Sequence, residues 1–169
     1  MNLVFMGNPA FAVPALEKLA ASDYQIVAVV SNPPKKMGRG KKIRETAIAI
    51  KAKSMGLHVI QEKDLNSSHF KRELEKLDAD LFVVVAFRIL PTSLISIPKL
   101  GSINLHGSLL PAYRGAAPIQ WALINGDEET GLSTFFITPK VDTGAVICQD
   151  RLLIRPSDNY GTLSERMGI

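Results

Sequence analysis

Three polar residues of this sequence could together carry out acyl-transfer chemistry: Asn104, His106 and Asp142. Asn104 and His106 lie two positions apart in the apolar run "GSINLH", so an extended strand places both side chains on one face. Both side chains can donate hydrogen bonds. The run leads into a glycine, and open α/β sheets bind ligands at the carboxyl ends of their strands. Spacing alone leaves two interpretations open, a catalytic pair and a satisfied pair that caps a turn.

Asp142 is the third member of the set. It stands in "TPKVDTGAV", a loop with Pro and Gly between two predicted strands, where the carboxylate can turn back over the end of the sheet. An Asp before Thr-Gly is also typical of an ordinary turn. Chemically, an amide and an imidazole can stabilise an oxyanion, while a carboxylate orients the imidazole and helps to remove a proton from an amine. The set fits acyl transfer to an amine without a covalent enzyme intermediate.

The elements that position these residues follow an alternating pattern of strands and helices. Helical patterns over 11–21, 43–56, 67–77 and 117–126 separate short apolar runs, and a further helix begins within "DNYGTLSERMGI". Such alternation is typical of a parallel sheet with helices on both faces. The seven predicted strands are "LVFMG", "QIVAVVS", "LHVI", "LFVVVAF", "GSINLH", "LSTFFIT" and "AVICQDRLLI".

Composition indicates one soluble domain. The chain has 169 residues, of which 46% are hydrophobic and 21% charged, and it has no apolar run long enough to span a membrane. The single cysteine, Cys148, excludes an internal disulfide and suits a reducing cytoplasm. Its strand-like setting predicts a packed side chain. We therefore expect a cytoplasmic protein that contacts no membrane.

Positive charge gathers in one segment. The net charge is only +4, yet six cations and no acid fall between positions 35 and 44. Such a cluster favours a phosphate-rich partner, and a solvated surface loop is the open alternative. The six residues are Lys35, Lys36, Arg39, Lys41, Lys42 and Arg44.

Common cofactor motifs are incomplete. "MGNPAF" follows the first predicted strand but lacks the second and third glycines of the dinucleotide fingerprint, so we expect no NAD. "GRGKK" lacks both the first glycine and the final Ser or Thr of a P-loop. His58, His69 and His106 have no acidic or cysteine partners at metal-ligand spacing, so we expect no metal.

The segment "NLHGSLLPAYRGAAPIQWALINGDEETG", followed by "VDTG", resembles the folate-dependent formyltransferases. Asn-x-His-x-Ser-Leu-Leu-Pro with a downstream Asp-x-Gly is specific to that group. "RGAAPIQ" and "GRGKK" are similar to its tRNA-acting branch. The similarity runs from "MGNPAFAVPALEKL" to "DTGAVI". It implies a Rossmann-like, open, mostly parallel sheet of about seven strands with helices on both faces.

The resemblance also implies roles for individual residues. Asn104, His106 and Asp142 match the catalytic residues of the group. The basic segment, roughly 33–44, is implied to enter the acceptor end of tRNA. The implied folate contacts are Ser108, Leu109, Leu110 and Pro111, with Arg88, Ile89 and Leu90 at the rim of the pterin pocket.

The implied reaction transfers a formyl group from 10-formyltetrahydrofolate to the α-amino group of initiator methionyl-tRNA, releasing tetrahydrofolate. Residues 1–169 then form the formyltransferase catalytic domain, as an N-terminal fragment without the group's C-terminal tRNA-binding β-barrel domain. We expect this domain to be a monomer.

Two alternatives stay open. The chain could formylate another amine, on glycinamide ribonucleotide or on a nucleotide amino sugar, or hydrolyse the same folate. "RIL" in "AFRILP" is similar to the glycinamide ribonucleotide branch, whereas the basic cluster favours tRNA. A non-catalytic RNA-binding module is the second alternative, and it predicts that Asn104, His106 and Asp142 lie apart.

Overall fold

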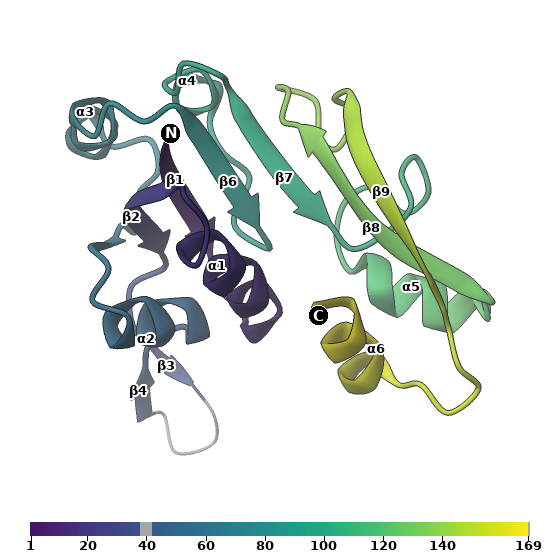
Figure 1. Ribbon diagram of the computed structural model, residues 1–169. Helices are drawn as coiled ribbons and strands as arrows, with labels where there is room; N and C mark the ends of the chain where they lie inside the picture. Colours follow the sequence, from purple (N-terminus) through teal and green to yellow (C-terminus); the bar gives the residue numbers. More distant parts are fainter. Residues whose placement is uncertain (38–41, 169) are drawn as a thin grey trace.

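The computed structural model describes residues 1–37 and 42–168. Its centre is a seven-stranded sheet in the order β5-β2-β1-β6-β7-β8-β9 (Figure 1). The first five of these strands pair in parallel, and β8 and β9 pair antiparallel. The strands are β1 Asn2–Gly7, β2 Gln25–Ser31, β5 Val59–Gln61, β6 Leu81–Val85, β7 Ser102–His106, β8 Glu129–Phe136 and β9 Val146–Leu153.

Helices cover both faces of the sheet, which confirms the predicted fold class. Alternate residues of the buried strands enter two separate cores, as the period of two requires. Phe5 packs with α1 and α2 on one face, whereas Met6 packs with α3 and α4 on the other. The helices are α1 Val13–Ala20, α2 Ala47–Ser54, α3 Ser68–Lys76, α4 Thr92–Ile95, α5 Pro118–Asn125 and α6 Tyr160–Gly168, with a 3-10 turn, η1 Ala10–Ala12, before α1.

The order in which strands are added to the sheet reverses beside β1. From β1 the chain moves outward to β2 and β5, and it then returns to place β6 on the other side of β1. In open α/β sheets, ligands bind in the crevice at the carboxyl ends of the strands near such a switch point. The carboxyl ends of β1 and β6, together with that of the neighbouring β7, therefore form the edge at which a site is expected.

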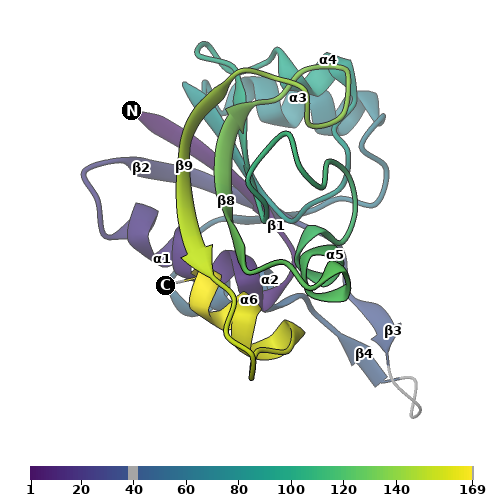
Figure 2. The ribbon, with the colours of Figure 1, turned by 90° about the vertical axis from the view of Figure 1, so that its right-hand side faces the viewer.

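Two local predictions were wrong. The helix predicted from Ile43 begins at Ala47, where Thr46 Oγ1 caps it by accepting from Ala49 N at 3.0 Å. The residues before it belong to a two-stranded hairpin, β3 Lys35–Met37 and β4 Lys42–Arg44, which projects from the body of the domain in both views (Figure 2). Cys148 is exposed rather than packed, because it lies on the edge strand β9.

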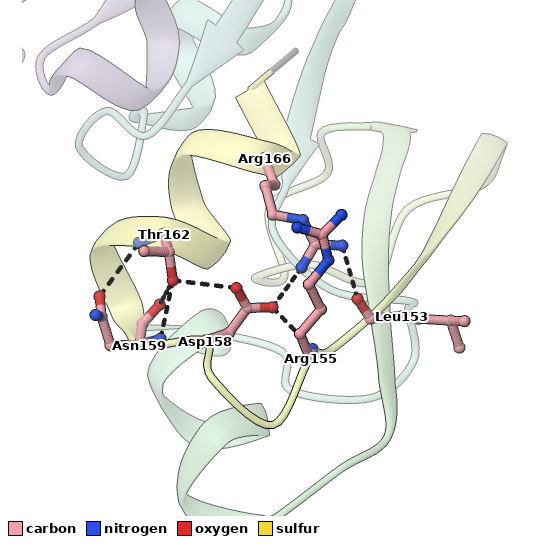
Figure 3. Close-up of polar contacts among 6 residues, drawn as sticks. All are labelled: Leu153, Arg155, Asp158, Asn159, Thr162 and Arg166. Carbon is pink, nitrogen blue, oxygen red and sulfur yellow. Dashed lines mark hydrogen bonds and ion pairs between the residues drawn. The ribbon is translucent and has the colours of Figure 1, made fainter.

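The C-terminal helix α6 packs against α5 and η1 through Leu163 and Met167, which share a small core with Ile119. Its start is fixed by polar contacts (Figure 3). Asn159 Oδ1 accepts from the backbone N–H of Gly161 at 2.8 Å and of Thr162 at 3.2 Å. This is the arrangement of an N-cap, which satisfies amides that have no partner inside the helix.

Asp158 anchors the same helix to the end of β9. Its carboxylate accepts from Arg155 N at 2.8 Å and from Thr162 Oγ1 at 3.1 Å, and it pairs with Arg166 (Figure 3). Arg166 also donates to the carbonyl of Leu153 at 3.0 Å.

Within the described residues, no helix has the length and apolar character needed to cross a membrane.

The Asp158 contacts predict a pH-dependent stability. The backbone N–H of Arg155 holds the pKa of the Asp158 carboxyl below its ordinary value of 3.8, and Thr162 and Arg166 act in the same direction. Because the folded pKa is the lower one, the stabilisation is present above the unfolded pKa and is lost as pH falls through the folded pKa. Asp158→Asn should therefore melt below the unmodified protein at pH 7.

This difference in melting temperature should narrow as the pH falls below roughly 4, and it should close once the pH lies below the lowered pKa of the folded carboxyl, where the carboxylate of the unmodified protein is protonated. Melting followed by circular dichroism between pH 2 and pH 7 measures it. Asp23→Asn, at an exposed loop residue, is the matched control. A difference that stays constant across this pH range would contradict the assignment.

Candidate active site

Asn104, His106 and Asp142 line one cavity of about 560 Å³ at the carboxyl ends of β6 and β7. Asn104 and His106 lie on β7, opposite Phe135 and Ser133 of β8. The three residues that the sequence brought forward are thus together in space, contrary to what the RNA-binding module predicts. Other residues that line the cavity are Pro9, Phe11, Val84, Ala86, Phe87, Arg88, Ile89, Leu90, Gly115, Ile119, Gln120, Phe135, Ile137, Thr138, Val141 and Tyr160.

An oxygen atom lies near each ring nitrogen of His106. Its Nε2 lies 2.8 Å from the carbonyl oxygen of Tyr113, and its Nδ1 lies 3.7 Å from Asp142 Oδ2. A carbonyl only accepts, so Nε2 carries a proton and donates it to Tyr113. Nδ1 is then the ring nitrogen available on the Asp142 side. The two side chains are 7% and 12% exposed, so little water weakens their interaction.

Asp142 is held in the β8–β9 connection. Its backbone is left-handed, with φ of 49°, and its Oδ2 accepts from the backbone N–H of Gly115 at 2.8 Å. The backbone of this connection passes close to the end of β8, which explains the glycine two residues after Asp142. A Cβ at Gly144 would lie 1.6 Å from the carbonyl oxygen of Phe136. The "DTG" sequence therefore makes a tight turn and also aims a carboxylate at the cavity.

The loop between β7 and α5, residues 107–117, carries the two groups that touch His106 and Asp142. Buried Ser133 fixes its first half, since Ser133 Oγ accepts from Leu110 N at 2.9 Å and donates to the carbonyl of Ser108 at 2.6 Å. Gln149 of β9 donates to Ser133 Oγ at 2.8 Å and to the carbonyl of Leu110 at 2.9 Å. Side chains of the antiparallel strands thus hold the loop.

The second half of this loop is fixed through Tyr113. The phenol donates to Asp127 Oδ2 at 2.6 Å and accepts from Asn125 Nδ2 at 2.9 Å. Hydrogen bonding to the Asp127 carboxylate raises the pKa of the phenol, and the Asn125 bond opposes this shift. The phenol therefore stays protonated, as a donor, throughout the neutral range.

Comparison with known families shows which protein family the chain, and with it this cavity, belongs to. A family model described as formyl transferase matches residues 1–168. This chain belongs to the formyl transferase family. Catalytic residues in such a family act on a formyl carbon, which is the chemistry that the amide, imidazole and carboxylate fit.

Curated relatives of this formyl transferase carry more specific names. A methionyl-tRNA formyltransferase of Porphyromonas gingivalis is 47% identical over 99% of this chain and 52% of the relative. One of Flavobacterium johnsoniae is 45% identical over 99% of this chain and 53% of the relative. The chain spans about half the length of the curated relatives that it matches.

Solved structures show the same fold. A phosphoribosylglycinamide formyltransferase of Anaplasma phagocytophilum has a TM-score of 0.79 at 24% identity, covering 98% of this chain and 78% of that one. Another, from Coxiella burnetii, has a TM-score of 0.74 at 28% identity, covering 99% of this chain and 80% of that one.

Arg88, Ile89 and Leu90 line the cavity of this formyl transferase, and their place at the rim of a pterin pocket stays a prediction. The guanidinium of Arg88 is bound to the protein, because it donates to the carbonyls of Lys63 at 2.7 Å and of Glu62 at 2.6 Å. Burial lowers the pKa of this guanidinium, and the charges of Glu62 and Asp64 oppose the shift. Ile89 is largely exposed and Leu90 is buried.

The segment 108–111 does not line the same cavity. Ser108 is fully buried, and its hydroxyl donates to the carbonyl of Ala112 at 2.6 Å. Leu110 is buried as well, whereas Pro111 is exposed and Leu109 is half-buried. Contact of Ser108, Leu109, Leu110 and Pro111 with folate stays a prediction, and in the structure these residues support the loop.

Four of the six predicted tRNA-binding cations lie on the hairpin. Lys35, Lys36, Lys42 and Arg44 are exposed, and Lys35 stands directly opposite Arg44 in the β3–β4 pair. Like charges that face each other across a strand pair disfavour the pair. Arg39 and Lys41 lie outside the described residues.

Sequence reasoning missed five contributors to the site. Ser133, Gln149 and Asp127 act on the loop and not on a reacting group, and the Tyr113 carbonyl and Gly115 amide are backbone groups. Of these five, Gly115 alone could have been suspected from the sequence. Its backbone φ of 92° favours glycine, and a glycine does follow "AYR".

Ser133 provides a test of how the loop is held. Ser133→Ala leaves Leu110 N and the carbonyl of Ser108 without their buried partner, so the free energy of unfolding should fall by about 1–3 kcal/mol. Urea denaturation measures this loss, with exposed Ser93→Ala as the control. Equal stabilities for the two variants would show that the loop does not depend on Ser133.

Proposed function

We propose that this chain catalyses transfer of a formyl group from 10-formyltetrahydrofolate to the α-amino group of initiator methionyl-tRNA. The convergence of Asn104, His106 and Asp142 in one cavity of a formyl transferase carries the proposal. The names of relatives at 45–47% identity support methionyl-tRNA as the acceptor. Both substrates are cytoplasmic in bacteria, so we infer that location.

Residues at the cavity fit a folate. A volume of about 560 Å³ is in the usual range for a small-molecule site. Segment 87–90 forms one wall, and within the described part of the chain its backbone N–H and C=O groups find no hydrogen-bond partner. These groups can pair with the donor and acceptor edge of a pterin, while Leu90, Phe135 and Ile137 supply apolar contact.

The chemistry divides among the three side chains. As the neutral amine attacks the formyl carbon, the electron pair of the formyl C=O bond moves onto the oxygen. Asn104 Nδ2 and the Nδ1–H of His106 donate hydrogen bonds to that oxygen. Asp142 takes the proton that leaves the amine, directly or through one water. When the C=O bond re-forms, the bond to the folate nitrogen breaks, and that nitrogen takes up the proton that Asp142 accepted, directly or through the same water.

His106 suits this role in its imidazolium form. Nε2–H is committed to the Tyr113 carbonyl, so only a second proton, on Nδ1, makes the ring a donor toward the formyl oxygen. The Asp142 carboxylate at 3.7 Å stabilises that positive charge. The distance exceeds that of a hydrogen bond and therefore leaves Nδ1 free to donate to substrate.

Glycinamide ribonucleotide is the second candidate acceptor, because the solved structures with this fold include phosphoribosylglycinamide formyltransferases, one at 28% identity. An assay with ¹⁴C-formyl folate, offering methionyl-tRNA and glycinamide ribonucleotide together, separates the two. We propose residues 1–169 as the catalytic domain, so the assay includes this chain joined to the C-terminal half of the Porphyromonas gingivalis relative. Label on glycinamide ribonucleotide alone would overturn the proposed acceptor.

Asp142 and Asn104 give the sharpest kinetic prediction. Asp142→Asn keeps the shape but loses the proton acceptor, so kcat should fall by at least ~10²-fold while folate binding is largely kept. Asn104→Ala removes one oxyanion donor and should cost roughly 10²–10³-fold in kcat. Turnover at saturating methionyl-tRNA and fluorescence-detected folate affinity measure the two effects, with exposed Asp150→Asn as the control.

A full-speed Asp142→Asn enzyme would remove Asp142 from the mechanism and leave only its turn-forming role. A loss confined to folate affinity would instead assign Asn104 to ligand binding.

The hairpin cations predict a salt-dependent use of tRNA. Replacing Lys42 and Arg44 by Ala should raise KM for methionyl-tRNA and flatten its dependence on salt by about one unit of slope per lost phosphate contact. Arg72→Ala with Lys76→Ala, on α3 at the opposite end of the domain, is the matched control (Figures 1 and 2). Identical salt slopes for both double variants would contradict a role of the hairpin in binding tRNA.

A further inference from the structure

We infer that the Tyr113–Asp127 hydrogen bond, which lies outside the catalytic trio, sets the tautomer and the orientation of His106. Tyr113 is a positioning residue in this assignment, because it acts through the histidine and not on substrate. The inference deepens the proposed function, and its kinetic part rests on that function.

The first step is the contact itself. The carbonyl of Tyr113 is the hydrogen-bond partner of His106 Nε2, at 2.8 Å. In a neutral imidazole only one ring nitrogen carries a proton, and the bond made by one nitrogen decides the state of the other. A carbonyl at Nε2 therefore selects the Nε2–H form and leaves Nδ1 as the nitrogen that gains or loses a proton beside Asp142.

The second step is the backbone that aims this carbonyl. The backbone of Tyr113 is left-handed, with φ of 53°. This conformation is unfavourable in free energy for any residue that has a Cβ atom. Such a conformation persists only where surrounding contacts fix it. The phenol supplies those contacts, by donating to Asp127 Oδ2 at 2.6 Å and accepting from Asn125 Nδ2 at 2.9 Å.

The third step is the anchor for the phenol. Asp127 follows Gly126, which ends α5 in the left-handed conformation with φ of 69°. The backbone N–H of Asp127 donates to the carbonyl of Ala122 at 3.0 Å, which ties it to the last turn of the helix. Asp127 is thus a fixed acceptor, and it transmits the position of α5 to the Tyr113 carbonyl and from there to His106.

The test reads the imidazole directly. The protein is labelled with ¹⁵N-histidine, and its ring nitrogens are observed by NMR at a pH where the His106 ring is neutral. His58→Gln and His69→Gln assign the remaining signal to His106. We expect a protonated Nε2 and an unprotonated Nδ1 in the unmodified protein.

Tyr113→Phe keeps the aromatic ring and loses the bond to Asp127, so the Nδ1–H form should appear alongside the Nε2–H form. With the active chain or chimera, kcat should fall roughly threefold to tenfold, more than KM for folate changes, because the imidazolium loses the contact that orients its Nδ1–H toward the formyl oxygen. Asp127→Ala, which keeps the bond from Asn125, should act in the same direction and no more strongly. The double variant should be no worse than Tyr113→Phe alone, because both changes remove the Tyr113–Asp127 bond.

Two matched variants complete the experiment. Asp127→Asn keeps an oxygen that accepts from the phenol, so it should resemble the unmodified protein. Tyr24→Phe alters an exposed tyrosine in the loop before β2 and should change neither the ring nitrogens nor kcat.

Unchanged His106 nitrogens in both Tyr113→Phe and Asp127→Ala would overturn the inference, whatever the rates do. Altered nitrogens in those variants, with no formylated product from any form of the protein, would support the inference while the proposed function fails. Altered nitrogens together with the expected loss of kcat would support both.

Discussion

Two backbone groups, the carbonyl of Tyr113 and the N–H of Gly115, determine how this site is arranged. They lie two residues apart in one loop, and they bind His106 Nε2 and Asp142 Oδ2 respectively. His106 comes from a parallel strand and Asp142 from the connection between two antiparallel strands. Neither element alone fixes the distance between the imidazole and the carboxylate. The loop does so, because a single short stretch of backbone holds both side chains.

The rest of the fold serves to hold that loop over the end of the sheet. In the antiparallel register, His106 lies opposite Ser133, and Ser133 lies opposite Gln149. Directly opposite residues share a face, so Ser133 and Gln149 point to the side on which the loop lies. Two antiparallel strands therefore add three things to the parallel half: a support for the loop, a wall of the cavity and the turn that carries Asp142. A parallel sheet alone would supply only Asn104 and His106.

Much of this arrangement could be predicted from side-chain patterns. Alternation with period two placed Asn104 and His106 on one face, and the strand and helix pattern predicted the sheet and its helices. The predictions for Cys148 and for the segment that forms the hairpin were wrong for physical reasons. An apolar run does not reveal that its strand lies at an edge of the sheet, so exposure of Cys148 could not be foreseen. Charged residues are depleted in strands, yet short strands form in the basic segment because backbone pairing does not depend on side-chain type.

The groups that hold the site lay beyond such patterns, because a carbonyl or an amide looks the same at every position of a sequence. Only the constraints that backbone contacts impose on side chains leave a trace. Gly144 is one such trace, since the carbonyl of Phe136 occupies the space of a Cβ, and Gly115 is another, since its φ is positive. Tyr113 left none, because its left-handed backbone is held by its own phenol and not by the absence of a side chain. A residue of that kind becomes visible only when the partner of its side chain is known.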